Sequence, residues 1–354
     1  MVTEASNATA FEALTQATNG WLLAAWDGRP GGCADAPNPN SIVQRISKDA
    51  GHTWQPLQVI AAGNPGPEKW GYSDPSYVTD RETGTVFLCC VKSFDAGFFH
   101  SQAGTDPQAK NVLHAQVMHS DDHGQTRSNP RDITADITAA PTTWTSRFAT
   151  SGEGIQLRYG TLRGRLLQQY AVRIGAETKA LTVYCDDHGQ TWQAGEPFGE
   201  NMDENKVVEL ADGTVMVNSR SSKPGETYRK VAYSHDGGHT YGPAKAVPEL
   251  VDPRNNATLI RAYPNAPEGS ADAKILLFAN TFSTERRNGT VHISYDDGHT
   301  WARRRTFHPG EMQYCTLTAL DTPGEYALAY EAPLSSIVYR QISREWIENN
   351  EDVA

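Results

Sequence analysis

Short runs of β-forming residues, separated by polar turns, recur along most of the 354-residue chain. Runs of four to eight residues rich in β-branched and aromatic side chains are typical of β-strands. The clearest examples are 86–91, 181–185, 214–218, 230–234, 274–278 and 290–294. The terminal segment 343–350 is the one stretch whose pattern favours an amphipathic helix. The hydrophobic pattern therefore predicts an all-β fold.

An eight-residue pattern, Ser-x-Asp-x-Gly-x-Thr-Trp, occurs five times between these runs. Two copies are complete, at 47–54 and 294–301. Three copies carry one substitution each: Arg127 for Trp, Cys185 for Ser and Tyr241 for Trp. The aspartate can accept hydrogen bonds from the amides of its own turn, and the glycine supplies a positive φ. The closing aromatic offers an apolar face for packing. Each copy, called an Asp box below, predicts a hairpin turn whose aspartate serves the scaffold.

The spacing of the Asp boxes predicts the architecture. Successive copies lie between 49 and 73 residues apart, which indicates a repeat fold. Four-stranded blades arranged radially bury their faces against their neighbours and leave only short edges exposed. Five boxes, plus one blade closed by the two ends of the chain, predict a six-bladed β-propeller. No linker or low-complexity tract divides residues 1–354, so we expect a single domain.

Charge and composition exclude several classes of partner. The 31 basic and 42 acidic residues give a net charge of −11, which argues against nucleic acid or an anionic membrane surface. No stretch of about twenty apolar residues is present to span a bilayer. The start, Met1 to Glu4, lacks the basic residues and apolar core of a secretory signal. We therefore expect a cytoplasmic protein, although a secreted chain whose leader had been removed would look the same.

Cysteine and histidine spacing gives no sign of a metal site. The five cysteines show no Cys-x-x-Cys spacing, which predicts free and mostly buried thiols. They are Cys33, Cys89, Cys90, Cys185 and Cys315. Five histidines lie at or near variable positions of the boxes: His52, His123, His188, His239 and His299. We expect them on turn surfaces, and we expect no metal or organic cofactor.

Polar segments punctuated by glycine and proline stand apart from the β-forming runs. Because a propeller gathers loops at one end of its axis, we expect these segments to form a common site there. They are 27–37, 72–77, 202–206, 218–220, 285–289 and 313–316.

With these segments in place, the chain resembles the bacterial exo-sialidases, retaining glycoside hydrolases that remove terminal sialic acid. The resemblance runs from Leu14 to about Tyr339. It rests on the boxes together with five motifs: Asp-Ala-Pro-x-Pro-Asn-Ser from Asp35, Ser-Asp-Pro-Ser-Tyr at 73–77, Met-Asp-Glu-Asn-Lys at 202–206, Asn-Ser-Arg at 218–220, and Tyr314 followed by Thr-Leu-Thr-Ala-Leu. It implies that sialylated glycans are the substrates.

The resemblance implies three catalytic residues. Tyr314 matches the family's nucleophile and Glu204 the carboxylate that takes its proton. Sialic acid carries a carboxylate on the attacked carbon, which would repel an anionic nucleophile but not a phenol. Asp35 matches the general acid/base, which protonates the leaving oxygen and then deprotonates water. The alternatives are a turn cap for Asp35, an ordinary loop carboxylate for Glu204 and a half-buried strand aromatic for Tyr314.

The resemblance also implies residues that bind substrate. Arg220 and Arg286 match arginines that grip the substrate carboxylate, for which a planar guanidinium fork is suited. The offset to Gly289 favours Arg286 over Arg287, and the alternative is that these are solvated surface charges. The other matches are Asp74 for polar groups of the sugar, Phe98 and Phe99 for an N-acetyl pocket or as core aromatics, and Asn255 for a glycerol-chain or carboxylate contact.

One departure from the family pattern concerns the first arginine of the carboxylate clamp. The family opens with Arg-Ile-Pro-Ala-Leu, whereas this chain reads Ala-Phe-Glu-Ala-Leu at 10–14. Ala10 stands where the arginine is expected and Glu12 replaces the proline. Either two arginines form the clamp, or Arg29 or Arg45 takes the missing place.

Three functions remain open from the sequence. The leading one is a retaining exo-α-sialidase. A sialic-acid-binding propeller without hydrolysis is a second, but it would need no nucleophile. A transglycosylating relative, which passes the sugar to another glycan, is a third. Linkage preference, the sialic acid variant and the oligomeric state are not encoded in any motif.

Overall fold

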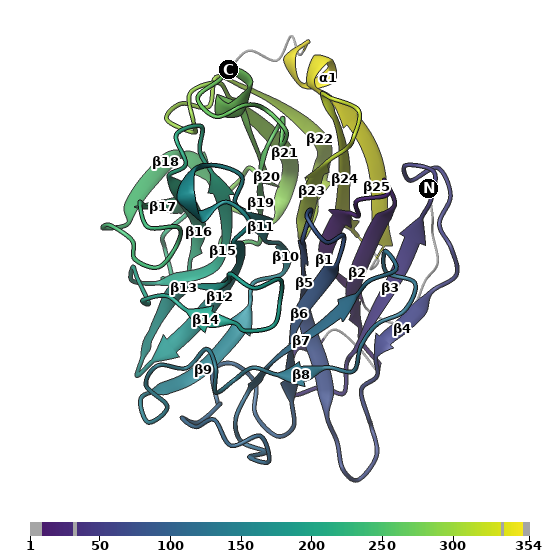
Figure 1. Ribbon diagram of the computed structural model, residues 1–354, viewed down its shortest axis with the longest axis vertical. Helices are drawn as coiled ribbons and strands as arrows, with labels where there is room; N and C mark the ends of the chain where they lie inside the picture. Colours follow the sequence, from purple (N-terminus) through teal and green to yellow (C-terminus); the bar gives the residue numbers. More distant parts are fainter. Residues whose placement is uncertain (1–8, 31–33, 334–335, 350–354) are drawn as a thin grey trace.

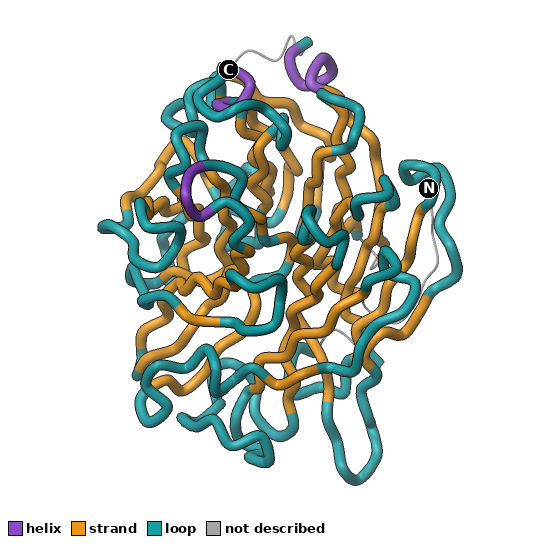
Figure 2. Tube along the Cα trace, in the orientation of Figure 1, coloured by secondary structure: helices purple, strands orange, loops and turns teal. Residues whose placement is uncertain are grey.

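The computed structural model of the protein describes residues 9–30, 34–333 and 336–349, with side chains from residue 13 onward. Within these ranges nearly all regular structure is β (Figure 2). The helices are three short segments: η1 (Gly160–Leu162), η2 (Asp272–Lys274) and α1 (Arg344–Glu348). The helix expected at 343–350 is confirmed as α1, which Ser343 caps by accepting a hydrogen bond from the Trp346 amide at 3.0 Å.

Six sheets, antiparallel apart from the pair of β10 with β5, form the six blades that the box spacing predicts. Blade 1 contains β1 (Thr9–Gln16), β2 (Leu22–Gly28), β3 (Ser41–Ser47) and β4 (Gln58–Ala61). Blade 2 contains β5 (Gly71–Thr79), β6 (Val86–Ser93), β7 (His114–Ser120) and β8 (Arg131–Asp132), with β10 (Gly152–Glu153) parallel to β5. Blade 3 contains β11 (Ile155–Gln156), β12 (Leu166–Ile174), β13 (Glu177–Cys185) and β14 (Gln193–Ala194), with β9 (Trp144–Ala149) also paired to β12.

The second half of the chain forms three simpler blades. Blade 4 contains β15 (Met202–Glu209), β16 (Val215–Ser221), β17 (Tyr228–Ser234) and β18 (Lys245–Val251). Blade 5 contains β19 (Thr258–Arg261), β20 (Leu276–Thr281), β21 (Arg287–Ser294) and β22 (Arg303–Glu311). Blade 6 contains β23 (Cys315–Ala319), β24 (Glu325–Ala332) and β25 (Ser336–Ser343).

The first and last blades pack against each other. Within the described residues, β1 is the innermost strand of blade 1, and blade 6 consists of β23, β24 and β25. Residues 1–8 lie outside the described ranges, so the expectation that both ends of the chain share one blade stays a prediction. Packing of β1 against β23 and β24 joins the first and last blades. The inner strands β1, β5, β15, β19 and β23 surround the middle of the molecule in Figure 1.

The Asp boxes form the turns that the sequence predicts, between the third and fourth strands of blades 1 to 5. In the first box, the Thr53 amide and hydroxyl donate to the two Asp49 oxygens at 2.8 and 2.6 Å, and the Gly51 amide donates to Ser47 Oγ at 2.8 Å. The bonds from Thr53 lower the pKa of Asp49 to about 2. In the third box, Cys185 Sγ takes the serine's place and accepts from Gly189. The box aspartates therefore serve the scaffold.

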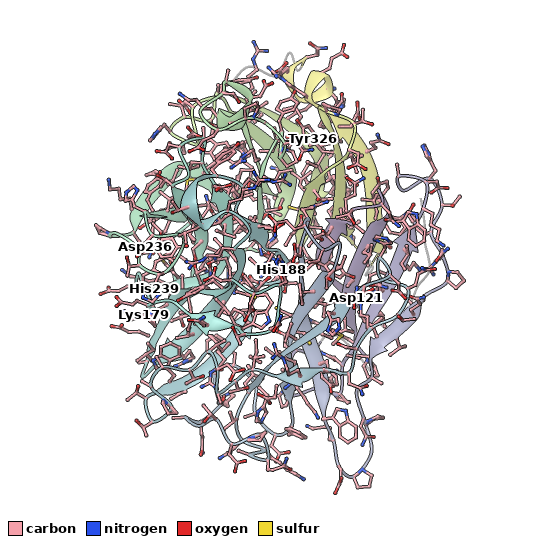
Figure 3. The ribbon with its side chains drawn as sticks, viewed as in Figure 1. Asp121, Lys179, His188, Asp236, His239 and Tyr326 are labelled. Carbon is pink, nitrogen blue, oxygen red and sulfur yellow. The ribbon has the colours of Figure 1, made fainter. Side chains whose placement is uncertain are left out.

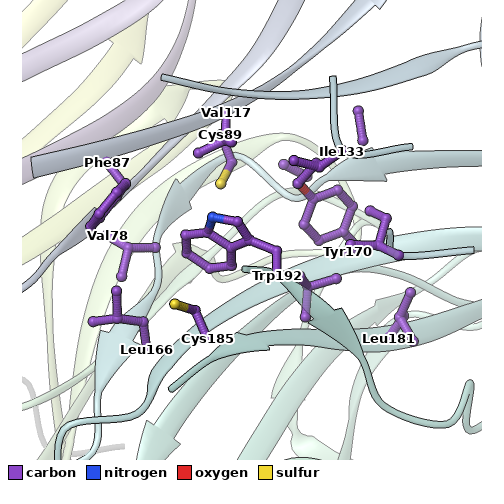
Figure 4. Close-up of a cluster of buried hydrophobic side chains, with 14 of the residues drawn as sticks. Val78, Phe87, Cys89, Val117, Ile133, Leu166, Tyr170, Leu181, Cys185 and Trp192 are labelled. Carbon is purple, nitrogen blue, oxygen red and sulfur yellow. The ribbon is translucent and has the colours of Figure 1, made fainter. Parts of the chain in front are cut away.

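The closing residue of a box packs against the preceding blade. Trp192 is buried in the core between blades 2 and 3, with its ring 5.7 Å from that of Phe87 (Figure 4). Arg127, which replaces the aromatic in the second box, donates to Gln44 Oε1 of blade 1 at 2.6 Å and lies 5.4 Å from the Tyr77 ring. The contact between this guanidinium and the Tyr77 ring takes the place of the packing that tryptophan provides in other boxes.

The cysteines and the residues of the fourth box occupy distinct places in the propeller. Cys89, Cys90, Cys185 and Cys315 are free and buried, as predicted, and Cys33 lies outside the described residues. Asp236 and His239 of the fourth box lie toward the outer side of blade 4, away from the inner strands (Figure 3). None of the helices in the described ranges is long and apolar enough to cross a membrane.

Candidate active site

Eight of the nine site residues expected from the sequence line one cleft of about 820 Å³. They are Asp35, Asp74, Phe98, Phe99, Glu204, Arg220, Arg286 and Tyr314. They come from blades 1, 2, 4 and 5 and from the segment that leads into blade 6. The expectation that the polar segments meet in one place is therefore confirmed for these residues.

Three of these residues lie on strands rather than on loops. Asp74 belongs to β5, Glu204 to β15 and Arg220 to β16, so the expectation of loops is wrong here. The pairing of β5 shifts register within 73–76, and that of β15 within 202–205. Asp74 itself has a φ of 59°, which a non-glycine residue rarely adopts. Irregularities of this kind redirect side chains at the end of a strand, and they are common next to active sites.

Arg220 joins the acidic and phenolic groups of the cleft. Its Nη2 lies 2.8 Å from Asp203 Oδ2, and its Nη1 pairs with Glu204 Oε2. The same Nη1 lies 3.4 Å from the Tyr314 hydroxyl. The Glu204 side chain is only 4% exposed and that of Arg220 is 18% exposed. One guanidinium therefore positions the expected base and the expected nucleophile together.

Burial and charge set the ionisation of this group. Burial raises the pKa of Glu204 above its ordinary value, and the Arg220 charge opposes that rise. Burial also disfavours the charge on Arg220, but the carboxylates of Asp203 and Glu204 outweigh it and raise the pKa of Arg220. The arginine therefore stays charged, while Glu204 accepts a proton more readily than a solvated glutamate does.

Asp35 faces the cleft from a loop after β2. Its carboxylate is 83% exposed and lies 2.8 Å from Arg29 Nη1. The Asn38 amide donates to the Asp35 carbonyl at 3.0 Å. A Cβ built on Gly97 would lie only 2.2 Å from the Ala36 carbonyl oxygen, so the 94–101 segment packs closely on this loop. The segment around Gly97 therefore supports the loop, while the Asp35 carboxylate remains exposed to solvent.

A second carboxylate pair lies beside Asp35. The Asp74 amide donates to Asp27 Oδ1 at 3.2 Å, and Arg29 Nη2 lies 3.1 Å from Asp27 Oδ2. Burial raises the pKa of Asp27 to about 6. Burial, with the charges of Asp27 and Asp35, raises the pKa of Asp74 well above its usual range. The environment of Asp74 thus favours a neutral carboxyl, which can donate a hydrogen bond.

Arg286 is a second cleft arginine that lies near Tyr314. Its guanidinium lies 5.5 Å from the Tyr314 ring centroid, and its Nη1 donates to Gln313 Oε1 at 2.7 Å. Arg287 does not line the cleft, and its Nη1 lies 3.8 Å from the exposed Glu285 carboxylate. The geometry favours Arg286 over its neighbour as the cleft arginine.

Aromatic residues form one apolar part of the cleft. Phe98 lies between Phe99 and Phe148, with ring centroids 5.2 and 4.8 Å away. Phe98 packs against the buried cluster that contains Leu113 and Phe148. Phe99 is 64% exposed, and Arg173 lies 5.2 Å from its ring. Phe98 therefore combines a core contact with a place in the cleft wall, whereas Phe99 is a rim residue.

The chain is similar to a known protein family and to known proteins. Residues 20–326 match the family model described as a BNR repeat-like domain. The chain belongs to the BNR repeat-like domain family. It is 55% identical over 337 residues to a sialidase of Micromonospora viridifaciens, an alignment that covers 95% of this chain and 51% of that protein. The chain thus spans about half the length of this relative.

Solved structures support the same family relationship. The Hadza microbial sialidase Hz136 superposes with a TM-score of 0.86 at 26% identity, covering 96% of this chain and 66% of that one. The intramolecular trans-sialidase from Ruminococcus gnavus superposes with a TM-score of 0.82 at 18% identity, covering 98% and 96%. At that identity the second likeness concerns the fold alone. The resemblance to bacterial sialidases drawn from the motifs is confirmed.

Asn255 is the one expected site residue of this family member that does not line the cleft. It is fully buried, and its side-chain amide donates to Thr281 Oγ1 at 3.2 Å and to the Gln313 carbonyl. The backbone amide of Asn255 donates to Asp252 Oδ1 at 2.8 Å. Asn255 therefore supports the segment that carries Tyr314, and a direct substrate contact by Asn255 stays a prediction that its burial does not favour.

The two candidates for the missing first arginine differ in position. Arg29 lines the cleft and pairs with Asp27 and Asp35. Arg45 lies on β3, outside the cleft lining, and its Nη1 donates to the Gln55 carbonyl at 3.1 Å. Arg29 is therefore the arginine with access to a ligand. The backbone of Ala10 pairs with Asp27, and its side chain lies outside the described part of the structure.

Four further polar residues share the cleft: Asp203, Glu311, Gln313 and Glu331. The sequence analysis includes Asp203 and Gln313 in its polar segments without assigning them a role, and it does not include Glu311 and Glu331. The Tyr314 amide donates to Glu331 Oε2 at 3.4 Å. Asp203 and Gln313 lie next to recognised residues, so their neighbours could have pointed to them, whereas Glu311 and Glu331 carry no such signal. Among the described residues, no group of three or more His, Cys, Asp or Glu side chains is arranged to hold a metal ion.

Proposed function

We propose that this chain is a retaining exo-α-sialidase that removes terminal sialic acid from glycoconjugates. The observation that carries the proposal is the contact of one guanidinium, Arg220, with both the Glu204 carboxylate and the Tyr314 hydroxyl. Asp35 opens onto the same cleft. The relationship to the Micromonospora viridifaciens sialidase supports the same activity.

Substrate capture falls to the two arginines that flank Tyr314. Arg220 and Arg286 present guanidinium groups to the carboxylate of sialic acid. Asp74, whose environment favours the neutral carboxyl, donates to a polar substituent of the sugar. Phe98 offers an apolar surface to a methyl group such as that of an N-acetyl substituent. The exposed Phe99 lies at the rim, where the aglycone leaves.

In the first step the Tyr314 oxygen attacks the anomeric carbon while Glu204 takes the phenol proton. Asp35, in its protonated form, gives a proton to the leaving glycosidic oxygen as the bond to the anomeric carbon breaks. The neutral phenol approaches the substrate carboxylate without charge repulsion. The positive charge of Arg220 stabilises both the ionised base and the developing negative charge on the tyrosine oxygen.

In the second step Asp35 removes a proton from water, which attacks the anomeric carbon on the face that the aglycone left. The bond to Tyr314 breaks, and Glu204 returns its proton to the phenolate. Two displacements at one carbon give net retention. The exposure of Asp35 suits this role, because water must reach it once the aglycone has gone. No metal or organic cofactor takes part in these steps.

Transfer to another sugar is the alternative to hydrolysis, and the fold alone does not separate them, because both sialidases and an intramolecular trans-sialidase share it. Hydrolysis is favoured here because the Asp35 carboxylate is open to solvent. A purely sialic-acid-binding propeller has no use for a nucleophile and base aligned on one arginine.

The test is Tyr314→Phe, which removes only the attacking oxygen. Turnover of an aryl sialoside should fall by orders of magnitude while thermal stability and ligand binding stay close to wild type. Mass spectrometry of the wild type with a fluorinated sialoside should show a covalent adduct on Tyr314. Retention of more than about a tenth of wild-type kcat would reject Tyr314 as the nucleophile. Sialylated products with added lactose, in place of free sialic acid, would indicate transfer.

A further inference from the structure

A second cavity, called the basal cavity below, lies at the other end of the inner strands. On β15, Glu204 lines the active-site cleft and Glu209 lines the basal cavity. On β5, Asp74 lines the cleft and Thr79 the basal cavity. At about 3.3 Å per residue the two ends are roughly 16 Å apart. The basal cavity measures about 100 Å³. Since a water needs about 10–15 Å³ of such space, a small polyatomic ion fits.

Three arginines from three blades line this cavity. Arg81 follows β5 of blade 2, Arg158 follows β11 of blade 3, and Arg261 ends β19 of blade 5. Burial and the nearby charges of Arg81 and Arg261 lower the pKa of Arg158 to about 10. Like charges held together in a partly buried place repel one another, so the arrangement favours an anion between them.

The acidic groups beside the arginines are engaged elsewhere. Glu209 accepts from the backbone amides of Arg158 and Tyr159 at 2.9 and 3.0 Å, and lies 3.3 Å from Arg261 Nη2. Burial raises the pKa of Glu153, which favours its neutral form. Three guanidiniums therefore share the cavity with two carboxyl groups, Glu209 and Glu153, so positive charge is left over even when both are ionised.

Donor groups remain available toward the cavity. The Arg261 side chain is only 6% exposed, and its buried Nε has no hydrogen-bond partner among the described residues. The guanidinium of Arg81 makes no hydrogen bond or ion pair within the described ranges, although its backbone amide donates to Gln156. A buried donor without a partner costs free energy, which a bound acceptor would recover.

We propose that the basal cavity binds a tetrahedral oxyanion, inorganic phosphate or sulfate, between the guanidiniums of Arg81, Arg158 and Arg261. Guanidinium forks match the oxygens of such ions, and several donors can share one ion. The ion joins blades 2, 3 and 5 at the base of the propeller. Because only the folded chain brings these blades together, binding raises the stability of the fold.

The test measures phosphate binding and thermal unfolding of the purified chain, against sodium chloride at equal ionic strength. Phosphate should raise the midpoint of unfolding in a saturable way. Arg81→Gln removes one guanidinium without breaking a hydrogen bond of the folded chain, so it should weaken phosphate binding about tenfold or more. Arg163→Gln is the matched control, because Arg163 is exposed, lies outside the cavity lining and carries the same charge.

Diffraction from crystals grown with selenate locates the anion site independently. It tests the proposal even if Arg81→Gln does not fold. The expected result is an anomalous peak between Arg81, Arg158 and Arg261. The proposal is overturned if that peak is absent, if phosphate acts no more strongly than chloride, or if Arg81→Gln binds phosphate like the control. Equal effects of acetate and phosphate would overturn the tetrahedral assignment.

Discussion

Replacing Arg220 with lysine tests the arrangement on which the proposed activity depends. The guanidinium uses Nη2 for Asp203 at 2.8 Å and Nη1 for Glu204 and the Tyr314 hydroxyl. A lysine keeps the positive charge but has one nitrogen, so it cannot serve both sides of the fork. Losing one charge-assisted contact costs about 1.5–3 kcal/mol, which corresponds to roughly a 10- to 150-fold loss. The loss should fall on kcat as well as KM, because Arg220 contacts both the nucleophile and the base.

The assay is kcat and KM for release of sialic acid from an aryl sialoside, with thermal unfolding measured alongside. Lysine leaves the buried carboxylates of Asp203 and Glu204 with a counter-charge, so the fold should survive. Arg287→Lys is the matched control: it is exposed, pairs with Glu285 at 3.8 Å and lies outside the cleft lining. It should stay within about twofold of wild type. If Arg220→Lys did the same, the joint positioning of Glu204 and Tyr314 by this arginine would be refuted.

Three further predictions concern catalysis and substrate capture. Asp35→Ala should slow natural glycosides roughly 100-fold or more but aryl sialosides far less, since an aryl leaving group needs little protonation; equal losses would assign Asp35 to positioning. Burial raises the pKa of Glu204, so the loss of kcat/KM on acidification should begin at a pH higher than the ordinary glutamate pKa of about 4.3. A decline that begins only at or below that value would contradict the role of Glu204 as base. Ala10→Arg combined with Glu12→Pro should lower the KM of a sialoside roughly ten- to a hundred-fold. If KM is unchanged and a structure with bound substrate shows Arg29 in contact with the carboxylate, Arg29 has replaced the missing arginine.

The architecture could be predicted from the sequence because its signal is local. The hydrogen bonds that shape an Asp-box turn lie within the box itself, as between Thr53 and Asp49, so the pattern alone specifies the turn. Closure of the ring has no such signal. The packing of β1 against β23 and β24 brings together segments from opposite ends of the described chain, and no local pattern near 9–16 records it. The number of blades was therefore predictable, whereas this packing was not.

The site depended on the resemblance for a physical reason. Arg220 and Tyr314 are 94 residues apart in sequence and 3.4 Å apart in space, a proximity that no local pattern encodes. The strand irregularities that direct Asp74 and Glu204 into the cleft were hidden for the same reason, since polar residues at a strand end read as a loop. Asn255 matched the family by type, but its position is settled by packing behind Gln313.

The charge of the cleft bears on how it can hold an anionic substrate. Its lining includes six acidic residues and only three arginines, of which Arg29 is already paired with Asp27 and Asp35. Under the proposed function, a sialic acid carboxylate therefore enters a site whose ionised form is acidic. Protonation of Asp74, whose pKa burial and neighbouring carboxylates raise, removes one of the opposing charges. Binding then favours lower pH, while Glu204 must stay ionised to act as base, which favours higher pH. Because Ala10 stands in place of an arginine, fewer positive charges offset each carboxylate that ionises. The pH range in which substrate binding and the base are both favoured is therefore narrower here than with a three-arginine clamp.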